Sequence, residues 1–385
     1  MSKYWKPFRI RRKELLPIVQ GGMGVGVSAH HLAGEVAKLG AVGTIASVEL
    51  RQLHPDLLAL SEGIRDNAIV VETNLEALCR EMLMARQICG KDGFIAVNIM
   101  RAVTEWKGLV RQACESGADA IVMGAGLPLD LPEHTKEYPD VALIPILSEA
   151  RGVEIVLKRW MARYGRHPDA IVIEHPQYAG GHLGAKNVSA VMDPKFDFGD
   201  VLLEIFKVFA KLDIKEDAIP IIVAGGINSP DKVREVMALG AAAAQVGTAF
   251  AVTEEGDAHP NFKKVLLEAK PEDIRVFMST AGLPARAVMT PWLARYLAKE
   301  RFIQSAHIRH GRCVRGVQCL EYCGLTDLEP TTAGRFCIEV LLAKALHGDV
   351  RGGLFFTGSG PLPFPDIRPV RELIEYLLEM PKATA

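Results

Sequence analysis

The stretch PIIVAGGINSPDKVREVMALGAAAAQVGT, residues 220–248, decides the fold. Its two ends, 220–226 and 242–248, are short apolar runs that finish at glycines, as buried strands often do. The segment between them, 229–241, begins with Ser-Pro, spaces its apolar residues as a helix does and finishes at a glycine. The stretch therefore predicts a strand, a helix and a second strand. When a helix joins two buried strands in this way, the strands pair in parallel.

The same unit recurs along the first two thirds of the chain. Six further strand-like runs occupy residues 17–21, 42–48, 93–99, 120–126, 142–148 and 170–175. Helical patterns at 28–40, 75–90, 109–118 and 152–165 lie between them. Eight such units fit an α/β fold of the (β/α)8 TIM barrel type, which takes about 250 residues. A doubly wound open sheet is the alternative.

Composition narrows the class of protein. The chain has 385 residues, of which 49% are hydrophobic and 24% charged, values close to those of ordinary globular proteins. Its 45 basic and 46 acidic residues nearly cancel, so no overall field favours nucleic acid. No apolar run is long enough to span a membrane, and the start of the chain lacks the pattern of a signal peptide. We expect a cytoplasmic protein with neither nucleic acid nor membrane as partner, and with a homo-oligomer as one option for its assembly.

The pattern changes after the eighth strand. Residues 254–337 contain Pro-punctuated segments that favour helices, among them 262–269, 273–282 and 291–304. A further helical pattern at 335–348 and another at 368–380 follow. The sequence predicts a barrel over 1–253, a helical cap on the substrate side over 254–337, and C-terminal helices over 338–385 that return to the barrel wall.

Glycines mark where a ligand would bind. In TIM barrels the loops after the strands carry the active site, and the loops after strands seven and eight often bind a phosphate. Gly225, Gly226, Gly247 and Thr248 lie in these two loops, and their bare backbone N–H groups predict a phosphate cradle. Ordinary barrel turns are the alternative.

Two earlier loops could contact a flat ligand. After the first strand, Gly22 and Met23 lie in a glycine-rich segment that lets the backbone approach closely, although a tight turn explains it equally well. Asn98, at the end of the third strand, offers an amide to a heteroaromatic ring edge or caps a helix.

The loop after the sixth strand holds the ionisable candidates. It contains Glu174, His175 and His182 in the sequence EHPQYAGGHLG. We expect His182 to reach a ligand and to titrate near neutral pH, although a loop histidine is more often a structural hydrogen-bonding residue. His175, beside a proline, is the weaker candidate. A metal site built from these three side chains has no recognised spacing, and we expect no metal.

Four cysteines, Cys313, Cys319, Cys323 and Cys337, cluster in the cap region. Their irregular spacing matches no zinc or iron–sulfur pattern, which favours structural thiols over metal ligands. All seven cysteines of the chain are expected to be reduced, because the odd count and uneven spacing do not suit a disulfide framework.

Five motifs together resemble the nitronate monooxygenase family, also known as 2-nitropropane dioxygenases. They are PIVQGGMG at 17–24, VNIM at 97–100, AGGH at 179–182, VAGGI at 223–227 and QVGT at 245–248. The family is similar to the FMN-dependent enoyl-acyl-carrier-protein reductases with a barrel fold. The resemblance covers residues 1–250 and, more loosely, the rest of the chain.

The resemblance implies an FMN-dependent oxidoreductase and a role for each matching residue. His182 matches the catalytic histidine, either as a base toward a neutral nitroalkane or as a group that orients an anionic nitronate. Glu174 matches a polar position that is often glutamine, with one extra residue between it and His182. The implied cofactor-binding residues, along the flavin and around its phosphate, are Gly22, Met23, Asn98, Glu174, Gly180, Gly181, Gly225, Gly226, Gln245, Gly247 and Thr248.

The first prediction is that the protein oxidises alkyl nitronates with dioxygen. The expected partners are therefore a small-molecule substrate and dioxygen. The alternatives are an NAD(P)H-dependent reductase of quinones or enoyl thioesters and an IMP dehydrogenase-like enzyme that uses Cys323 as nucleophile. A barrel that binds a phosphate ligand without catalysis is the alternative outside the enzymes.

Overall fold

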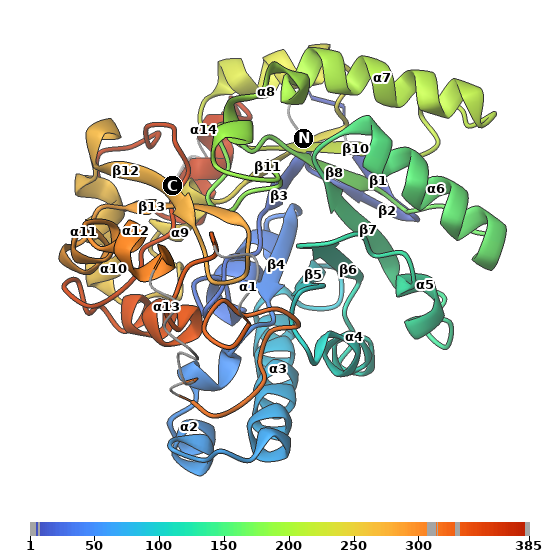
Figure 1. Ribbon diagram of the computed structural model, residues 1–385. Helices are drawn as coiled ribbons and strands as arrows, with labels where there is room; N and C mark the ends of the chain where they lie inside the picture. The colour runs from blue at the N-terminus through green and yellow to red at the C-terminus, as the bar shows by residue number, and fades with distance from the viewer. Residues whose placement is uncertain (1–4, 7, 306–312, 314, 328–331, 382–385) are drawn as a thin grey trace.

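The computed structural model describes residues 5–6, 8–305, 313, 315–327 and 332–381. Eight parallel strands close into a barrel (Figure 1). In barrel order they are β3 (Ile18–Gln20), β4 (Val42–Ala46), β5 (Phe94–Met100), β6 (Ala120–Gly124), β7 (Ala142–Leu147), β8 (Ile171–Glu174), β10 (Ile221–Ala224) and β11 (Ala243–Val246). Each strand coincides with a predicted run, so the closed barrel is confirmed and the doubly wound sheet was wrong.

Helices cover the outside of the barrel. Those that lie between the barrel strands are α1 (His30–Lys38), α2 (Pro55–Ser61), α3 (Asn67–Cys89), α4 (Trp106–Glu115), α5 (Leu131–His134), α6 (Ala150–Tyr164), α7 (Phe198–Lys211) and α8 (Pro230–Ala238). The start of α8 shows why the predicted helix forms. The Ser229 hydroxyl accepts the N–H of Lys232 at 3.3 Å, and Pro230 occupies the first helical position. Gly240 then reverses the chain with a φ of +101°.

Two separate cores hold the barrel. Small and β-branched residues fill its inside, for example Ala120 and Val122 of β6. The alternate residues of the same strand, Ile121 and Met123, face outward and pack under the helices. Because both faces are buried, each strand reads as a continuous apolar run rather than an alternating one. At the amino-terminal end, the antiparallel hairpin of β1 (Phe8–Ile10) and β2 (Lys13–Leu15) adds apolar side chains to the inner core and closes that end.

The segment after β11 combines helices with a small sheet. It contains α9 (Thr248–Ala251), α10 (Pro260–Glu268), β12 (Ile274–Met278), β13 (Pro284–Val288), α11 (Pro291–Leu297) and α12 (Glu300–Ser305). The helix expected within 273–282 was wrong, because these residues include strand β12. This strand pairs with β13, and β13 pairs in turn with the short strand β9 (Gly181–His182). The partner of β12 is the next strand, so the two form a local hairpin, and only β9 reaches this sheet from a distant part of the chain. Pairing in the hairpin overrode the helical pattern.

The end of the chain returns to the barrel. Helix α13 (Ile338–Leu346) lies with the elements of the preceding segment (Figure 1). Helix α14 (Val370–Leu377) contacts α1, α8 and α9. Helix α14 thereby covers the barrel wall between α1 and α8. The four-residue α9 is too short to cover this part of the wall.

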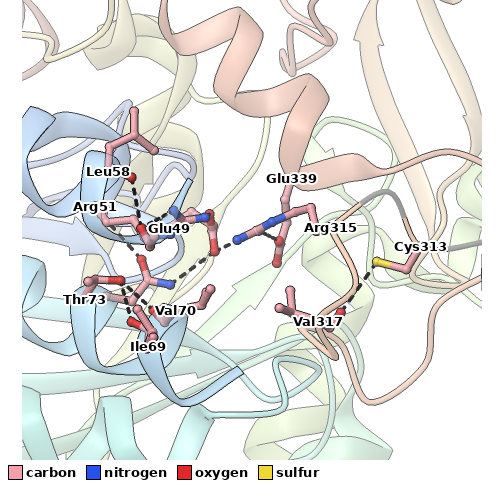
Figure 2. A network of polar contacts seen from close by, with 12 residues as sticks. Glu49, Arg51, Leu58, Ile69, Val70, Thr73, Cys313, Arg315, Val317 and Glu339 are labelled. Atoms are coloured by element: carbon pink, nitrogen blue, oxygen red, sulfur yellow. Dashed lines mark hydrogen bonds and ion pairs between the residues drawn. The ribbon is translucent and has the colours of Figure 1, made fainter. Parts of the chain in front are cut away.

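A buried charge network ties the loop around residues 315–323 to the barrel (Figure 2). Arg315 lies between two carboxylates: its guanidinium is 3.0 Å from Glu49 and also pairs with Glu339 on α13. Glu49 accepts further hydrogen bonds from Arg51 at 2.8 Å and from Asn74 at 3.1 Å. Two arginines thus balance two carboxylates away from solvent.

Candidate active site

A cavity of about 280 Å³ opens at the carboxyl ends of the barrel strands. Residues from all eight strands or the loops that follow them contribute to its wall. The structure brings to this one cavity all the residues that the family resemblance assigned to the site. These are Gly22, Met23, Asn98, Glu174, Gly180, Gly181, His182, Gly225, Gly226, Gln245, Gly247 and Thr248.

The loop after β3 is held flat against the cavity by three polar contacts. The buried Gln20 side chain accepts the N–H of Thr44 at 2.8 Å and donates to the carbonyl of Gly21 at 2.5 Å. The Ser28 hydroxyl accepts the N–H of Met23 at 2.8 Å. A Cβ on Gly22 would lie 2.4 Å from the Cβ of Asn98, so only glycine lets this loop pass the asparagine.

The loops after β10 and β11 form the predicted cradle. The backbone N–H groups of Gly225, Gly226, Gly247 and Thr248 donate no hydrogen bond to any residue that the structure describes. Gly226 has a φ of +72°, and a Cβ there would lie 2.9 Å from the Cβ of Tyr178. Unpaired amides that converge at one end of a cavity are suited to bind an anion such as a phosphate.

The C-terminal loop at 356–362 is a part of the site that the sequence analysis missed. Thr357, Gly358, Gly360 and other residues of this loop line the cavity. The N–H of Gly358 donates to the Thr248 hydroxyl at 2.9 Å, which fixes the loop beside the cradle. The glycines of the segment FFTGSGPLPF were the available signal, but more than a hundred residues separate them from the loop that they meet.

His182 lies on β9 and lines the cavity beside Phe356, whose ring centroid is 5.5 Å away. Its Nε2 is 3.0 Å from the hydroxyl of Ser279, a fully buried residue that the sequence did not single out. The expectation that His182 titrates near neutral pH was wrong. Burial disfavours the charged imidazolium and lowers its pKa to about 4. At neutral pH His182 is therefore an uncharged hydrogen-bonding group.

Glu174 ends β8 and reaches the cavity from the barrel interior. Burial raises its pKa to about 7, although the positive charge of Arg286 on β13 acts in the opposite direction. Burial also lowers the pKa of Arg286 to about 10. The Arg286 guanidinium donates to the carbonyl oxygens of Pro176, at 3.2 Å, and of Ala179, and so braces the loop between Glu174 and His182.

His175 does not line the cavity. Its ring is 2% exposed, accepts the N–H of Gln177 at 3.2 Å and lies 3.4 Å from the Asp197 carboxylate. It is a structural residue of the loop. The three-residue metal site of Glu174, His175 and His182 does not form, because among the described residues only His30, His31 and Asp257 group as ligands would.

The cap cysteines lie away from the cavity wall. No three of their sulfur atoms approach one another as metal ligands would within the described part of the chain. Burial raises the pKa of Cys323, the reverse of what a cysteine nucleophile requires. That the protein needs no metal stays a prediction.

One end of the cavity is apolar, which the sequence did not indicate. Val25 and Val27 of the first loop, Phe262 of α10, Leu342 of α13 and Leu362 of the C-terminal loop line it. These residues come from four separate segments, and only the folded chain brings them together.

Comparisons with known proteins agree with this architecture. The family model for nitronate monooxygenase matches residues 10–380. A probable nitronate monooxygenase of Bacillus subtilis is 26% identical over 313 residues, 76% of this chain and 81% of that protein. A nitronate monooxygenase of Paraburkholderia phytofirmans is 34% identical over 126 residues, 33% of this chain and 32% of that protein.

Solved structures share the fold. FabK from Thermotoga maritima matches with a TM-score of 0.67 and 23% identity, covering 94% of this chain and 92% of that chain. Nitroalkane oxidase from Streptomyces ansochromogenes matches with a TM-score of 0.63 and 19% identity, covering 94% and 95%. No helix in the described ranges is long and apolar enough to cross a membrane.

Proposed function

Because the chain belongs to the nitronate monooxygenase family and is a flavin-dependent oxidoreductase, we propose that it binds FMN and oxidises alkyl nitronates with dioxygen. The products would be a carbonyl compound and nitrite. FMN would supply the electron chemistry, and the protein would supply position, hydrogen bonds and a dry cavity.

The observation that favours FMN is the set of four unpaired backbone amides at Gly225, Gly226, Gly247 and Thr248. They lie at one end of the cavity, where a terminal monophosphate would satisfy them. A dinucleotide such as FAD is commonly bound at a G-x-G-x-x-G turn after a strand, and no such turn follows any of the eight barrel strands. In this proposal Thr248 and the two loops hold the phosphate.

The ring system would lie over the upper end of the barrel. Gly22 and Met23 from the first loop and Gly180 and Gly181 from the sixth would flank it. Asn98, Glu174 and Gln245 would face its polar edges, because all three project from strands at the level of the cavity floor.

His182 would hold the substrate. An imidazole with a pKa of about 4 is a weak base at neutral pH, so abstraction of a proton from a neutral nitroalkane is disfavoured. A neutral imidazole can still donate one N–H to the oxygen of a nitronate. This favours the nitronate, which arrives already deprotonated, as the substrate form.

The apolar end of the cavity would take the alkyl group of the substrate. It lies between the first loop, helix α10 of the region that we predict as a substrate-side cap, 254–337, and helix α13 of the C-terminal part, 338–385, while the barrel takes 1–253. We propose these boundaries with the correction that the cap contains the β12–β13 hairpin.

Anaerobic mixing of the purified protein with propyl-2-nitronate tests the function. Reduction of the bound flavin, followed by oxygen consumption and nitrite release in air, is the expected result. Faster reduction by NADH or NADPH than by the nitronate would favour the quinone or enoyl-thioester reductase instead. Mass spectrometry of the released cofactor should identify FMN, and FAD would contradict the cradle.

A further inference from the structure

Glu174 occupies a position from which its side chain must enter the cavity. It is the last residue of β8, and Val172, two residues earlier, belongs to the inner core of the barrel. Because side chains alternate along a strand, Glu174 projects to the same side as Val172. The side chain therefore points toward the barrel axis, where it forms part of the cavity wall.

The carboxyl group has no partner in the part of the chain that the structure describes. Its side chain makes no hydrogen bond there and no ion pair within 4.0 Å. The neighbouring charge is the Arg286 guanidinium. Its Nη1 donates hydrogen bonds to the carbonyls of Pro176 and Ala179 rather than to Glu174. A half-buried carboxyl group that faces a cavity without a protein partner is suited to a ligand.

Few other ionisable groups surround it. Of the residues that line the cavity, only His182 on β9 and Tyr178 in the preceding loop also carry ionisable side chains. Arg286 faces it from β13, and His175 lies under the loop with Asp197. Burial lowers the pKa of both histidines, so neither adds a positive charge near neutral pH. Among the described residues, Arg286 is the cation whose charge lowers the pKa of Glu174.

We propose that Glu174 is a proton-exchanging partner of the flavin, whose protonation state controls the reduction potential of the ring. This inference rests on the proposed function, because it requires flavin in this cavity. The proposal gives Glu174 a role in setting the reduction potential of the flavin. The carboxyl group is not consumed in the reaction.

The physical reason is electrostatic. A carboxylate beside the ring opposes the negative charge that arrives with electrons, whereas a neutral carboxylic acid can donate its O–H to the ring. When two electrons enter the ring from the substrate, Glu174 would therefore take up one proton from solvent, in addition to any proton that the ring takes. Since burial raises the pKa of Glu174 to about 7, this exchange would occur near neutral pH.

The reduction potential of the bound flavin, measured against pH by titration with redox dyes, tests the proposal without reference to turnover. The titrations cover pH values from about one and a half units below to about one and a half units above the pKa of about 7. The potential of the wild-type protein should fall more steeply with pH than that of Glu174→Gln. One added proton per two electrons means a tenfold change in the equilibrium constant per pH unit, which is about 30 mV.

Asp257→Asn is the matched control. Burial raises the pKa of Asp257 to about 6, yet this carboxylate accepts the N–H groups of Ala29 and Leu32 at the start of α1 and does not line the cavity. The control should keep the steep slope. Equal slopes for the wild type and Glu174→Gln would overturn the proposal, and so would loss of the slope in Asp257→Asn as well.

A second measurement covers the case in which Glu174→Gln does not fold. The visible spectrum of oxidised flavin in the wild type should change with pH around a single midpoint. Arg286→Gln should move this midpoint upward by about one pH unit or more, because an opposite charge is removed. A spectrum that does not change with pH would overturn the proposal. A wild-type protein that contains no flavin would instead contradict the proposed function.

Discussion

In the proposed function, the neutral imidazole of His182 decides which substrate form the site can use. Its Nε2 contacts the Ser279 hydroxyl at 3.0 Å, and Ser279 also accepts the N–H of Ala281 at 3.2 Å. Ser279 is fully buried and therefore holds the ring in one orientation. Ring orientation, rather than positive charge, is what the protein provides at this point.

Replacement of His182 should separate binding of the cofactor from binding of the substrate. We expect His182→Asn to keep its flavin, because the cradle lies on other strands. The kcat/KM for a nitronate should fall about 10-fold to 100-fold, the worth of a hydrogen bond to a charged group. Ser279→Ala should lose less, since the imidazole remains. Wild-type kinetics in His182→Asn would remove this residue from the mechanism.

Gly226→Asp should empty the flavin site. The new Cβ would press on Tyr178, and the carboxylate would repel a phosphate. Absorbance of the purified variant at the flavin wavelengths measures the loss. Gly165→Asp is the control, because Gly165 has a similar φ of +61° but open space around it. It carries the same backbone strain and should keep its flavin. Full flavin content in both variants would contradict the cradle.

At the scale of elements, α3 is fastened to its neighbours through Glu81. This carboxylate is fully buried and accepts the backbone N–H of His30 at 2.8 Å. Imidazole nitrogens of His30 and His54 lie 2.8 and 2.9 Å from its two oxygens. Burial alone would raise its pKa, but the hydrogen bonds from the two histidines lower the pKa to about 2.

Glu81 should therefore make the stability depend on acid pH. A lowered pKa means that the ionised carboxylate stabilises the fold above about pH 4.5 and that this contribution disappears as the pH falls through about 2. The contribution is about 3 kcal/mol. In urea unfolding at several pH values, Glu81→Gln should lose that part of the acid dependence. The exposed Glu216→Gln should not, and identical curves for Glu81→Gln and the wild type would contradict the assignment.

Across the whole molecule, the charge network of Figure 2 joins three distant parts of the chain. Glu49 follows β4, Glu339 begins α13, and Arg315 comes from the loop between them in space. The network lies beside the barrel mouth, since Ser47 and Val48, directly before Glu49, line the cavity. The position of α13, and with it the apolar end of the cavity, depends on these contacts.

Arg315→Met should destabilise the protein strongly, because it leaves Glu49 and Glu339 buried without their shared cation. Loss of one partner of a buried pair costs about 3–5 kcal/mol. Urea denaturation measures the free energy of unfolding. Arg111→Met, which breaks the exposed pair with Glu115, should cost no more than about 0.5 kcal/mol. Similar small losses in both variants would show that the network does not hold the loop around residues 315–323.

The sequence by itself determined the barrel and the residues around its mouth. Continuous apolar runs separated by helical patterns require buried parallel strands, and the carboxyl ends of such strands meet at one face. For this reason the glycines of the seventh and eighth units, Asn98 and His182 could all be assigned to one site before their distances were known. Their shared location follows from topology alone.

Only the tertiary structure decided what surrounds these residues. The long-range part of the small sheet is the pairing of β13 with β9, about a hundred residues earlier, which the sequence pattern did not reveal. Burial lowers the pKa of His182, and its ring contacts Ser279, which follows β12, and Phe356 of the C-terminal loop. Burial and long-range pairing depend on segments that are a hundred or more residues apart. A local sequence pattern shows which side chain enters the site, whereas its charge state depends on everything that packs around it.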